Sequence, residues 1–291
     1  MKRARMMLVT SMVIFGTIGL FKKAIPITSG ELALYRAILA MALLLGVMLV
    51  TRQRIPLKKL GRQLPLLLLS GAAMGVNWIL LFESFNHSVA LGTLSYYFAP
   101  VIVTAACPLL FREKLTLPQI ICFAVSTAGL AIITCASGMD AGSSYLLAVL
   151  FGLGAAAFYA SVILLNKFIT GVEGLHRTIL QFASAIVTLI PYVALTSGVT
   201  LGGMDALGWV CLLILGFVHT GLAYVMYFPS IKALPGQKAA ILSYIDPLVA
   251  VIISVLVLRE PMSGWQWLGG GMILGATLCN ELFLAKKTKK P

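Results

Sequence analysis

Long apolar stretches without a charged residue alternate with short polar segments along the whole chain. A hydrocarbon core about 30 Å thick is crossed by about 20 apolar residues in a helix, and seven uncharged stretches reach that length. Irregular backbone does not face lipid, and no ten-residue alternation suggests a barrel, so helices are predicted. The stretches are Gln63–Phe82, Ser84–Phe111, Leu115–Met139, Ala141–Asn166, Thr178–Met204, Ala206–Ile231 and Pro261–Asn280.

Three further apolar segments are less clean. They are Met6–Phe21, Leu32–Thr51, which contains Arg36, and Ala239–Leu258, which contains Asp246. With these segments included, the pattern predicts an all-α integral membrane protein with ten transmembrane helices.

The first segment also has features of a secretory signal peptide, because Lys2, Arg3 and Arg5 precede it. Its apolar run ends in Phe21-Lys22-Lys23, however, and lacks the small-residue cleavage site of such a peptide. A retained first helix is therefore favoured.

The composition agrees with a membrane protein, and the distribution of charge predicts its orientation in the membrane. Of the 291 residues, 60% are hydrophobic and 11% charged, and 22 Lys and Arg against 9 Asp and Glu give a net charge of +13. In a soluble protein this charge would suggest a nucleic-acid partner. Here, with an inside N-terminus, 18 basic residues fall on the inner side and three, Lys22, Lys23 and Arg259, on the outer side. The bias predicts an inner-membrane protein with both termini cytoplasmic, and no nucleic-acid partner.

Residues that could bind a metal or carry catalysis are few. The five cysteines, at positions 107, 122, 135, 211 and 279, all lie in apolar segments and are interpreted as packing residues. The three histidines, His87, His176 and His219, form no metal motif and no pair of nucleophile and base. We therefore expect no metal, no cofactor and no enzyme activity, with an intramembrane enzyme as a distant alternative. A channel is disfavoured because no charged pore stripe is visible.

The two halves of the chain match at one fixed offset, without a gap. We divide the chain at 1–138 and 139–291, with five helices in each part, and an odd number makes the second part enter the membrane from the opposite side. Such inverted repeats are typical of transporters that bind substrate near the midplane. The non-aliphatic identities pair Tyr97 with Tyr244, Pro100 with Pro247, Arg112 with Arg259, Glu113 with Glu260 and Gln119 with Gln266.

With these motifs the sequence resembles the EamA family of the drug/metabolite transporter superfamily. The resemblance covers the whole chain and implies a fold of five plus five inverted helices, and export of amino acids or related metabolites. One departure is Phe158-Tyr159-Ala160, where the first half has Phe15-Gly16-Thr17. The matching motifs are Phe15-Gly16, Leu34-Tyr35-Arg36-Ala37, Tyr97-Phe98-Ala99-Pro100, Phe111-Arg112-Glu113-Lys114, Asp246-Pro247 and Leu258-Arg259-Glu260-Pro261.

Charged residues in a membrane span are costly and are functional candidates. Glu31 follows Thr28 in a capping-box pattern, so capping is favoured over a substrate role. Arg36 needs a partner, which Glu83 could supply, or it recognises a substrate carboxylate. Asp246, whose repeat equivalent is uncharged, is a candidate for proton coupling or ammonium binding, because a carboxyl group removed from water holds a proton more readily. A hydrogen bond between helices and a position at the inner membrane interface are its structural alternatives.

Polar and aromatic side chains supply the remaining candidates. His219, in the eighth helix, is either a proton relay or a neutral residue bonded to a neighbouring helix, and the latter is favoured. Trp265 and Trp267 are expected in an interfacial belt. The residues expected to line a substrate cavity are Asn77, Trp78, Tyr96, Tyr97, Tyr159, His219, Tyr224, Tyr227 and Tyr244.

Two glycine patterns, Gly71 with Gly75 and Gly271 with Gly275, have the spacing of close helix contacts. Packing within the fold is favoured over a dimer seam.

The sequence therefore predicts a secondary transporter that exports small metabolites, most consistently amino acids, by alternating access. Its partners would be a small-molecule substrate and the lipid bilayer, and the chain would work as a monomer because ten helices already contain both halves of a site. An exporter of organic cations remains the main alternative, since Asp246 among tyrosines could hold a cation.

Overall fold

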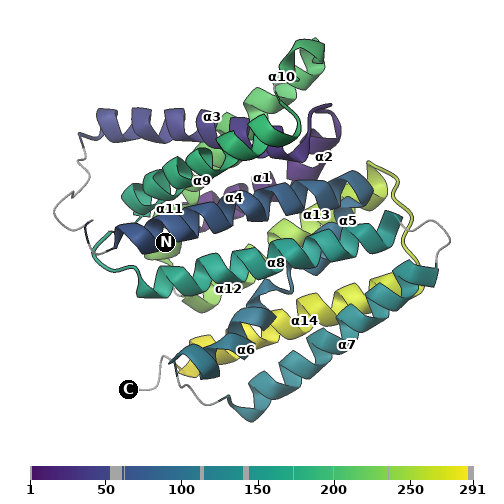
Figure 1. The fold of residues 1–291 in the computed structure, drawn as a ribbon. Helices are drawn as coiled ribbons and strands as arrows, with labels where there is room; N and C mark the ends of the chain where they lie inside the picture. Colours follow the sequence, from purple (N-terminus) through teal and green to yellow (C-terminus); the bar gives the residue numbers. More distant parts are fainter. Residues whose placement is uncertain are drawn as a thin grey trace.

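The computed structural model describes residues 2–52, 61, 63–111, 115–139, 144–172, 174–198, 200–234 and 236–287. Within these ranges every regular element is a helix (Figure 1). In chain order they are α1 (Lys2–Gly16), α2 (Ile18–Lys23), α3 (Ser29–Val50), α4 (Leu64–His87), α5 (Val89–Tyr96), α6 (Ala99–Phe111), α7 (Leu117–Met139), α8 (Ser144–Phe168), α9 (Gly174–Thr196), the 3₁₀ turn η2 (Leu201–Gly203), α10 (Ala206–Leu213), the π-helix η3 (Ile214–Leu222), α11 (Ala223–Ala233), α12 (Gly236–Ser243), α13 (Ile245–Leu256) and α14 (Gly264–Lys287).

Several of these helices follow one another almost without interruption and form single long units. The chain bends after Thr17 between α1 and α2, at Tyr97 and Phe98 between α5 and α6, and at Tyr244 between α12 and α13, whereas α10, η3 and α11 are continuous. In the described ranges, eight units are long and apolar enough to cross a membrane: Lys2–Lys23, Ser29–Val50, Leu64–His87, Val89–Leu110, Leu117–Ser137, Ser144–Phe168, Gly174–Thr196 and Ala206–Tyr227.

The outer surface of the bundle is apolar. Val50, Leu109 and Leu195 each expose more than four-fifths of their surface, which suits contact with lipid chains. The chain is therefore a multi-pass, all-helical membrane protein. A further apolar segment, Ile241–Leu256, is shorter than the eight units, and the expected count of ten spans stays a prediction.

The bundle is arranged around two long helices. α4 packs along α8, with α3 and α9 on one side and α6, α7 and α14 on the other (Figure 1). α1 begins and α14 ends at the same end of the bundle, on the left in Figure 1, which we term the termini end. The start of α1 and the end of α14 thus lie on one side of the bundle.

The offset between the two halves also relates the boundaries of helices. α5 and α12 have eight residues each, and they begin at Val89 and Gly236, which are separated by the same interval as Tyr97 and Tyr244. α7 and α14 begin at Leu117 and Gly264, again at this interval. The repeat inferred from side-chain identities therefore extends to the backbone. Arg112 and Glu113, the first-half partners of Arg259 and Glu260, lie outside the described residues.

Local contacts confirm the predicted start of α3. The Thr28 hydroxyl accepts a hydrogen bond from the Glu31 backbone N–H, and the Glu31 carboxylate accepts one from the Thr28 backbone N–H. Glu31 also accepts bonds from the backbone N–H and the hydroxyl of Thr200, at 2.6 Å and 2.7 Å. The capping residue thus links the start of α3 to the segment that follows α9.

Only one of the two glycine patterns makes a close contact between helices. Gly71 and Gly75 face residues of α9, including Ser184 and Ala185, as expected for packing within the fold. The expectation for Gly271 and Gly275 is wrong, because a Cβ added at either would meet nothing within 4 Å. Gly269 makes the close contact instead, with a Cβ there only 2.5 Å from the Gly129 carbonyl oxygen of α7.

Candidate functional site

A cavity of about 350 Å³ lies where the bent helical units meet. Residues of α1, α2, α3, α4, α5, α6, α8, α11, α12 and α13 line it, so both halves of the chain contribute. Tyr97 and Tyr244, which occupy the bends after α5 and α12, are among the lining residues. The two interrupted helices therefore border the same space.

Prolines explain why the two bends occur where they do. Proline has no backbone N–H, so Pro100 cannot bond to the carbonyl of Tyr96, four residues earlier, and Pro247 cannot bond to that of Ser243. α5 ends at Tyr96 and α12 ends at Ser243. The sequence thus places two helix ends, with polar backbone groups freed from helical bonding, beside the cavity.

Asp246 supplies a carboxylate to the cavity. It lies in the first turn of α13, just before Pro247, and lines the cavity. The Tyr97 hydroxyl donates a hydrogen bond of 2.7 Å to its Oδ2 atom. The bond joins the bends of the two equivalent helical units, one from each half of the chain.

Arg36 supplies a guanidinium group to the same cavity. It is only 3% exposed, and its Nε atom donates a 2.6 Å hydrogen bond to the Thr220 hydroxyl of η3. The guanidinium carbon lies 4.9 Å from the ring centre of Trp78 and 5.4 Å from that of Phe82. Both contacts are in the range of cation–π attraction.

These two opposite charges do not pair with each other. In the described part of the chain, neither Arg36 nor Asp246 has an oppositely charged side chain within ion-pair distance. Each is bonded to a neutral hydroxyl group instead, Thr220 and Tyr97 respectively. Uncompensated charges away from water are costly, so the cavity is chemically suited to a ligand that carries both signs.

Aromatic rings form much of the remaining wall. Tyr96 and Tyr159 have ring centres 5.3 Å apart, and Tyr97 and Tyr244 are 6.2 Å apart. The ring centre of Tyr224 lies 5.5 Å from that of Phe15, on α1. The wall thus combines apolar faces with hydroxyl groups, as ligand cavities commonly do.

Ten of the twelve residues that the sequence singled out for the site line this cavity. They are Arg36, Asn77, Trp78, Tyr96, Tyr97, Tyr159, Tyr224, Tyr227, Tyr244 and Asp246. Asn77 also serves the fold, since its amide donates a 2.7 Å bond to the Ala155 carbonyl of α8.

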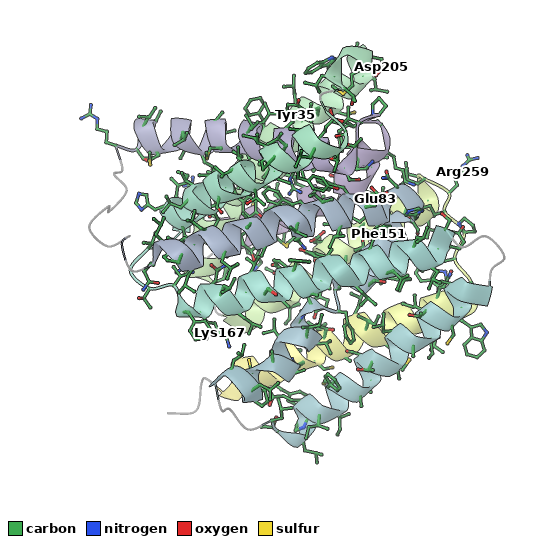
Figure 2. The ribbon with its side chains drawn as sticks, viewed as in Figure 1. Tyr35, Glu83, Phe151, Lys167, Asp205 and Arg259 are labelled. Carbon is green, nitrogen blue, oxygen red and sulfur yellow. The ribbon has the colours of Figure 1, made fainter. Side chains whose placement is uncertain are left out.

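Glu83 and His219 do not line the cavity. The expected pairing of Arg36 with Glu83 is wrong, because Glu83 accepts bonds from Ser29, at 2.6 Å, and from Asn86, at 3.1 Å. Its place near the end of α4 is visible in Figure 2.

His219 is buried, and its Nε2 atom lies 2.7 Å from the Thr17 hydroxyl at the bend between α1 and α2. This contact agrees with the favoured interpretation of His219 as a residue bonded to a neighbouring helix. It gives His219 no place in the cavity wall.

Sequence reasoning assigned no cavity role to several apolar lining residues, among them Met74, Leu81 and Phe85 of α4. They recur at helical spacing with Asn77 and Trp78, so the face of α4 could have been inferred from those two polar candidates. Phe15 was identified only as part of a motif.

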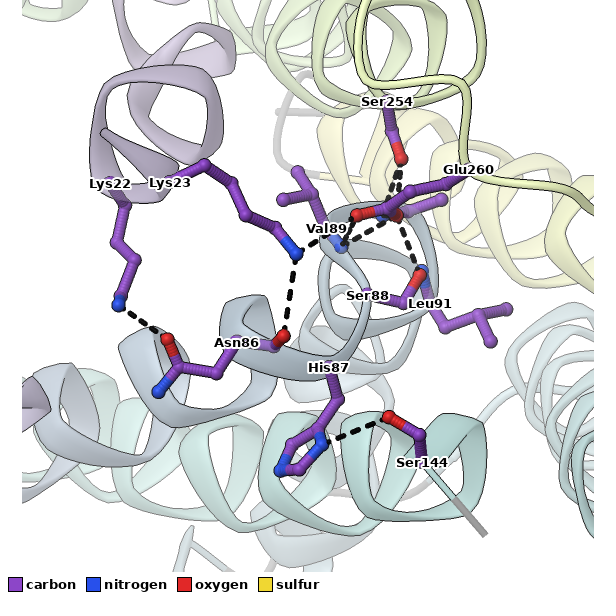
Figure 3. A network of polar contacts seen from close by, with 11 residues as sticks. Lys22, Lys23, Asn86, His87, Ser88, Val89, Leu91, Ser144, Ser254 and Glu260 are labelled. Atoms are coloured by element: carbon purple, nitrogen blue, oxygen red, sulfur yellow. Dashed lines mark hydrogen bonds and ion pairs between the residues drawn. The ribbon is translucent and has the colours of Figure 1, made fainter. Parts of the chain in front are cut away.

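A polar network, drawn in Figure 3, lies around the start of α5, at the end of the bundle opposite the termini end in Figure 1. Glu260 Oε2 accepts bonds from the Ser88 hydroxyl, at 2.8 Å, and the Val89 backbone N–H, at 2.8 Å. It also accepts a 2.6 Å bond from the Ser254 hydroxyl, and Lys23 Nζ lies 3.4 Å from its Oε1 atom. One carboxylate of the second half thus holds α2 and the start of α5 together.

The same network extends along α4. Lys22 donates to the Asn86 side-chain oxygen, and Lys23 donates to the Asn86 carbonyl oxygen. The sequence identified Glu260 by its repeat position but not by this role. Figure 2 shows neighbouring Arg259 at the same end, far from Lys167.

Comparisons with known proteins agree with the fold and the repeat. The model of the EamA-like transporter family matches the chain twice, at residues 2–135 and 146–281. An uncharacterized transporter of Bacillus subtilis strain 168, YxxF, is 30% identical over 91% of this chain and 85% of its own length. A second from the same organism, YojE, is 29% identical over 71% of this chain and 66% of its own length.

A solved structure, titled only as the crystal structure of a protein, has the same fold. It superposes with a TM-score of 0.67 at 15% identity, and the match covers 97% of this chain and 98% of the other.

Bent helical units, apolar outer surfaces and a cavity shared between two halves, together with similarity to known transporters, define a multi-pass membrane transporter. The chain belongs to the EamA-like transporter family. This confirms the resemblance inferred from its motifs.

Proposed function

We propose that this protein is a secondary transporter of the inner membrane that exports amino acids or closely related zwitterionic metabolites. Transport would occur by alternating access between two inverted halves, 1–138 and 139–291, with both termini in the cytoplasm. The chain would work as a monomer, since its cavity already receives residues from both halves.

One observation carries the proposal. Arg36 and Asp246 line one cavity with opposite charges, and each has a neutral partner in place of a counter-ion among the described residues. A carboxylate at Arg36 and an ammonium group at Asp246 would satisfy both charges at once. Amino acids carry these two groups in a single small molecule.

The dimensions and surface of the cavity support the same class of ligand. About 350 Å³ is at the lower end of ligand sites, which suits a single amino acid better than a peptide. The tyrosine and tryptophan rings offer apolar contact for a side chain, and the hydroxyl groups offer hydrogen bonds. An apolar or aromatic side chain fits this wall best.

Alternating access is supported by the repeat and by the polar network. Helix boundaries recur at the interval that separates Tyr97 from Tyr244, as expected if two similar halves exchange conformations. Glu260 and Lys23 hold together elements at the end opposite the termini. Under the predicted orientation that end faces outward, so this conformation would be closed to the outside.

Flux into proteoliposomes tests the proposed substrate class. Purified protein should move radiolabelled amino acids saturably and with counterflow, which separates a carrier from a channel. Liposomes without protein and liposomes containing the Asp246→Asn variant serve as controls. Absence of saturable movement across a panel of all natural amino acids would reject the substrate class.

An organic-cation exporter is the alternative that Asp246 and the tyrosines favour. Arg36 in the same cavity opposes it, since a buried guanidinium repels a cation. Competition by tetraphenylphosphonium decides between the two. We expect tetraphenylphosphonium to inhibit amino-acid flux less than the same concentration of unlabelled amino acid does. Stronger inhibition by tetraphenylphosphonium would favour the cation exporter.

The role of Glu260 gives a separate prediction. In Glu260→Gln, loss of the charge weakens the bonds to Ser88, the Val89 N–H and Lys23. Bonds to charged groups contribute about 1.5–3 kcal/mol, so the amides at the start of α5 should exchange with deuterium roughly tenfold faster. Hydrogen–deuterium exchange read by mass spectrometry measures this directly.

A matched control is Asp205→Asn. Asp205 caps α10 by accepting a 2.8 Å bond from the Gly208 N–H, and Figure 2 places it at the same end of the bundle. It takes no part in the Glu260 contacts, so exchange at α5 should stay unchanged. Equal exchange in the wild type and Glu260→Gln would show that Glu260 does not hold this end closed.

A further inference from the structure

The π-helix η3 lies against α3 and contains Thr220, whose hydroxyl bonds differently from threonine hydroxyls in α-helices. Threonine hydroxyls in α-helices usually bond to the carbonyl four residues back, as Thr277 does with Ile273 at 2.7 Å. Thr220 bonds instead to the Leu215 carbonyl, five residues back, at 3.0 Å. The wider turn therefore sets Thr220 at a different angle from that of a regular helix.

In this position Thr220 meets Arg36. It is fully buried and accepts the 2.6 Å bond from Arg36 Nε while its own proton goes to Leu215. Gly216 lets η3 approach α3 closely, because a Cβ there would lie 2.5 Å from Leu39 Cβ. Thr220 does not line the cavity, so it cannot itself contact a ligand there.

Arg36 is thus held on two sides. Thr220 occupies Nε, and the rings of Trp78 and Phe82 lie 4.9 Å and 5.4 Å from the guanidinium carbon. A guanidinium group offers five N–H donors in a rigid planar fork. With Nε engaged by Thr220, a carboxylate can still be bound bidentately by the two terminal nitrogens, in the end-on arrangement.

We infer that Thr220 is a positioning residue for substrate recognition: it fixes the plane of the Arg36 guanidinium so that its terminal nitrogens meet the substrate carboxylate. The inference rests on the proposed function and deepens it, because it assigns the carboxylate to the η3 side of the cavity. Thr220 acts only through Arg36, so it affects ligands with a carboxylate and no others.

The test compares two probes that differ only in the carboxylate. L-phenylalanine suits the aromatic wall, and 2-phenylethylamine is the same molecule without the carboxylate. Their affinities for purified full-length protein are measured by calorimetry, together with the KM and maximal rate of phenylalanine flux.

Thr220→Val removes the hydroxyl at nearly constant shape. It should weaken phenylalanine binding about tenfold and raise KM by a similar factor, with the maximal rate and phenylethylamine binding unchanged. Thr220→Ser keeps the hydroxyl and should restore the wild-type affinity. Thr277→Val, at a buried threonine whose hydroxyl donates to its own helix, is the matched control and should bind both probes normally.

The outcomes separate the inference from the function on which it rests. Equal weakening of both probes by Thr220→Val would mark a merely structural role, and unchanged phenylalanine affinity would reject the positioning role while the transporter function stood. Failure of the wild type to bind or move any amino acid would overturn both. Thr220→Ala provides the same comparison if the valine variant does not fold.

Discussion

Asp246→Asn removes the negative charge of the cavity and should reduce both binding and flux of amino acids at least about 30-fold. The reason is that loss of one partner from a desolvated charged contact costs about 2–5 kcal/mol. Asparagine has nearly the same shape as aspartate, and it can still accept the bond from the Tyr97 hydroxyl. The contact between the two helix bends should survive, so the effect reports on charge.

Two assays in proteoliposomes measure this and distinguish binding from proton coupling. Counterflow needs only binding and the conformational exchange, whereas accumulation needs a driving gradient. If Asp246 binds the ammonium group, the variant loses both. A variant that kept counterflow and lost only accumulation driven by a proton gradient would place Asp246 in coupling, and normal transport at every pH would exclude both roles. Tyr97→Phe, which removes the hydroxyl partner and keeps the charge, should have a much smaller effect.

Arg36→Gln should abolish recognition of the carboxylate without weakening recognition of the amine, because the buried guanidinium repels a cation. We expect phenylalanine affinity to fall at least about 30-fold, because the lost contact involves a desolvated charge. Arg36→Lys should recover only part of it, since an ammonium group lacks the fork that binds carboxylates bidentately. Calorimetry with phenylalanine and 2-phenylethylamine measures the selectivity.

Stability gives an independent control on this variant. Arg36 is 3% exposed without a counter-ion among the described residues, and removal of an uncompensated buried charge does not cost folding free energy as breaking an ion pair does. Arg36→Gln should therefore melt no lower than the wild type. A large fall in melting temperature, or equal loss of both ligands, would show that Arg36 mainly supports the fold.

Much of the fold could be predicted from the sequence because a membrane imposes simple rules on it. The spans follow from the length of uncharged stretches, and the bends follow from Pro100 and Pro247, whose missing N–H groups end α5 and α12. The tyrosines before these prolines line the cavity for the same reason. Proline alone does not mark a bend, however, because Pro108, Pro191 and Pro229 lie within α6, α9 and α11.

The partners of the charged residues could not be predicted, because they depend on which helices pack together. Arg36 was expected to pair with Glu83, yet Arg36 bonds to Thr220, 184 positions away, and Glu83 bonds to Ser29 and Asn86. Glu260 acts partly through the backbone N–H of Val89, and a backbone contact leaves no mark in the side-chain pattern. Gly271 and Gly275 had the right spacing but face open space.

The π-helix η3 also bears on how the chain tolerates changes in its length. A π turn holds one residue more than an α turn, and each added residue would turn the rest of an α-helix by about 100°. Tyr224 and Tyr227 of α11 follow the π-helix Ile214–Leu222 and line the cavity, so this segment sets the register in which they face it. Gain or loss of one residue within this segment would therefore turn both tyrosines relative to the cavity without altering any loop.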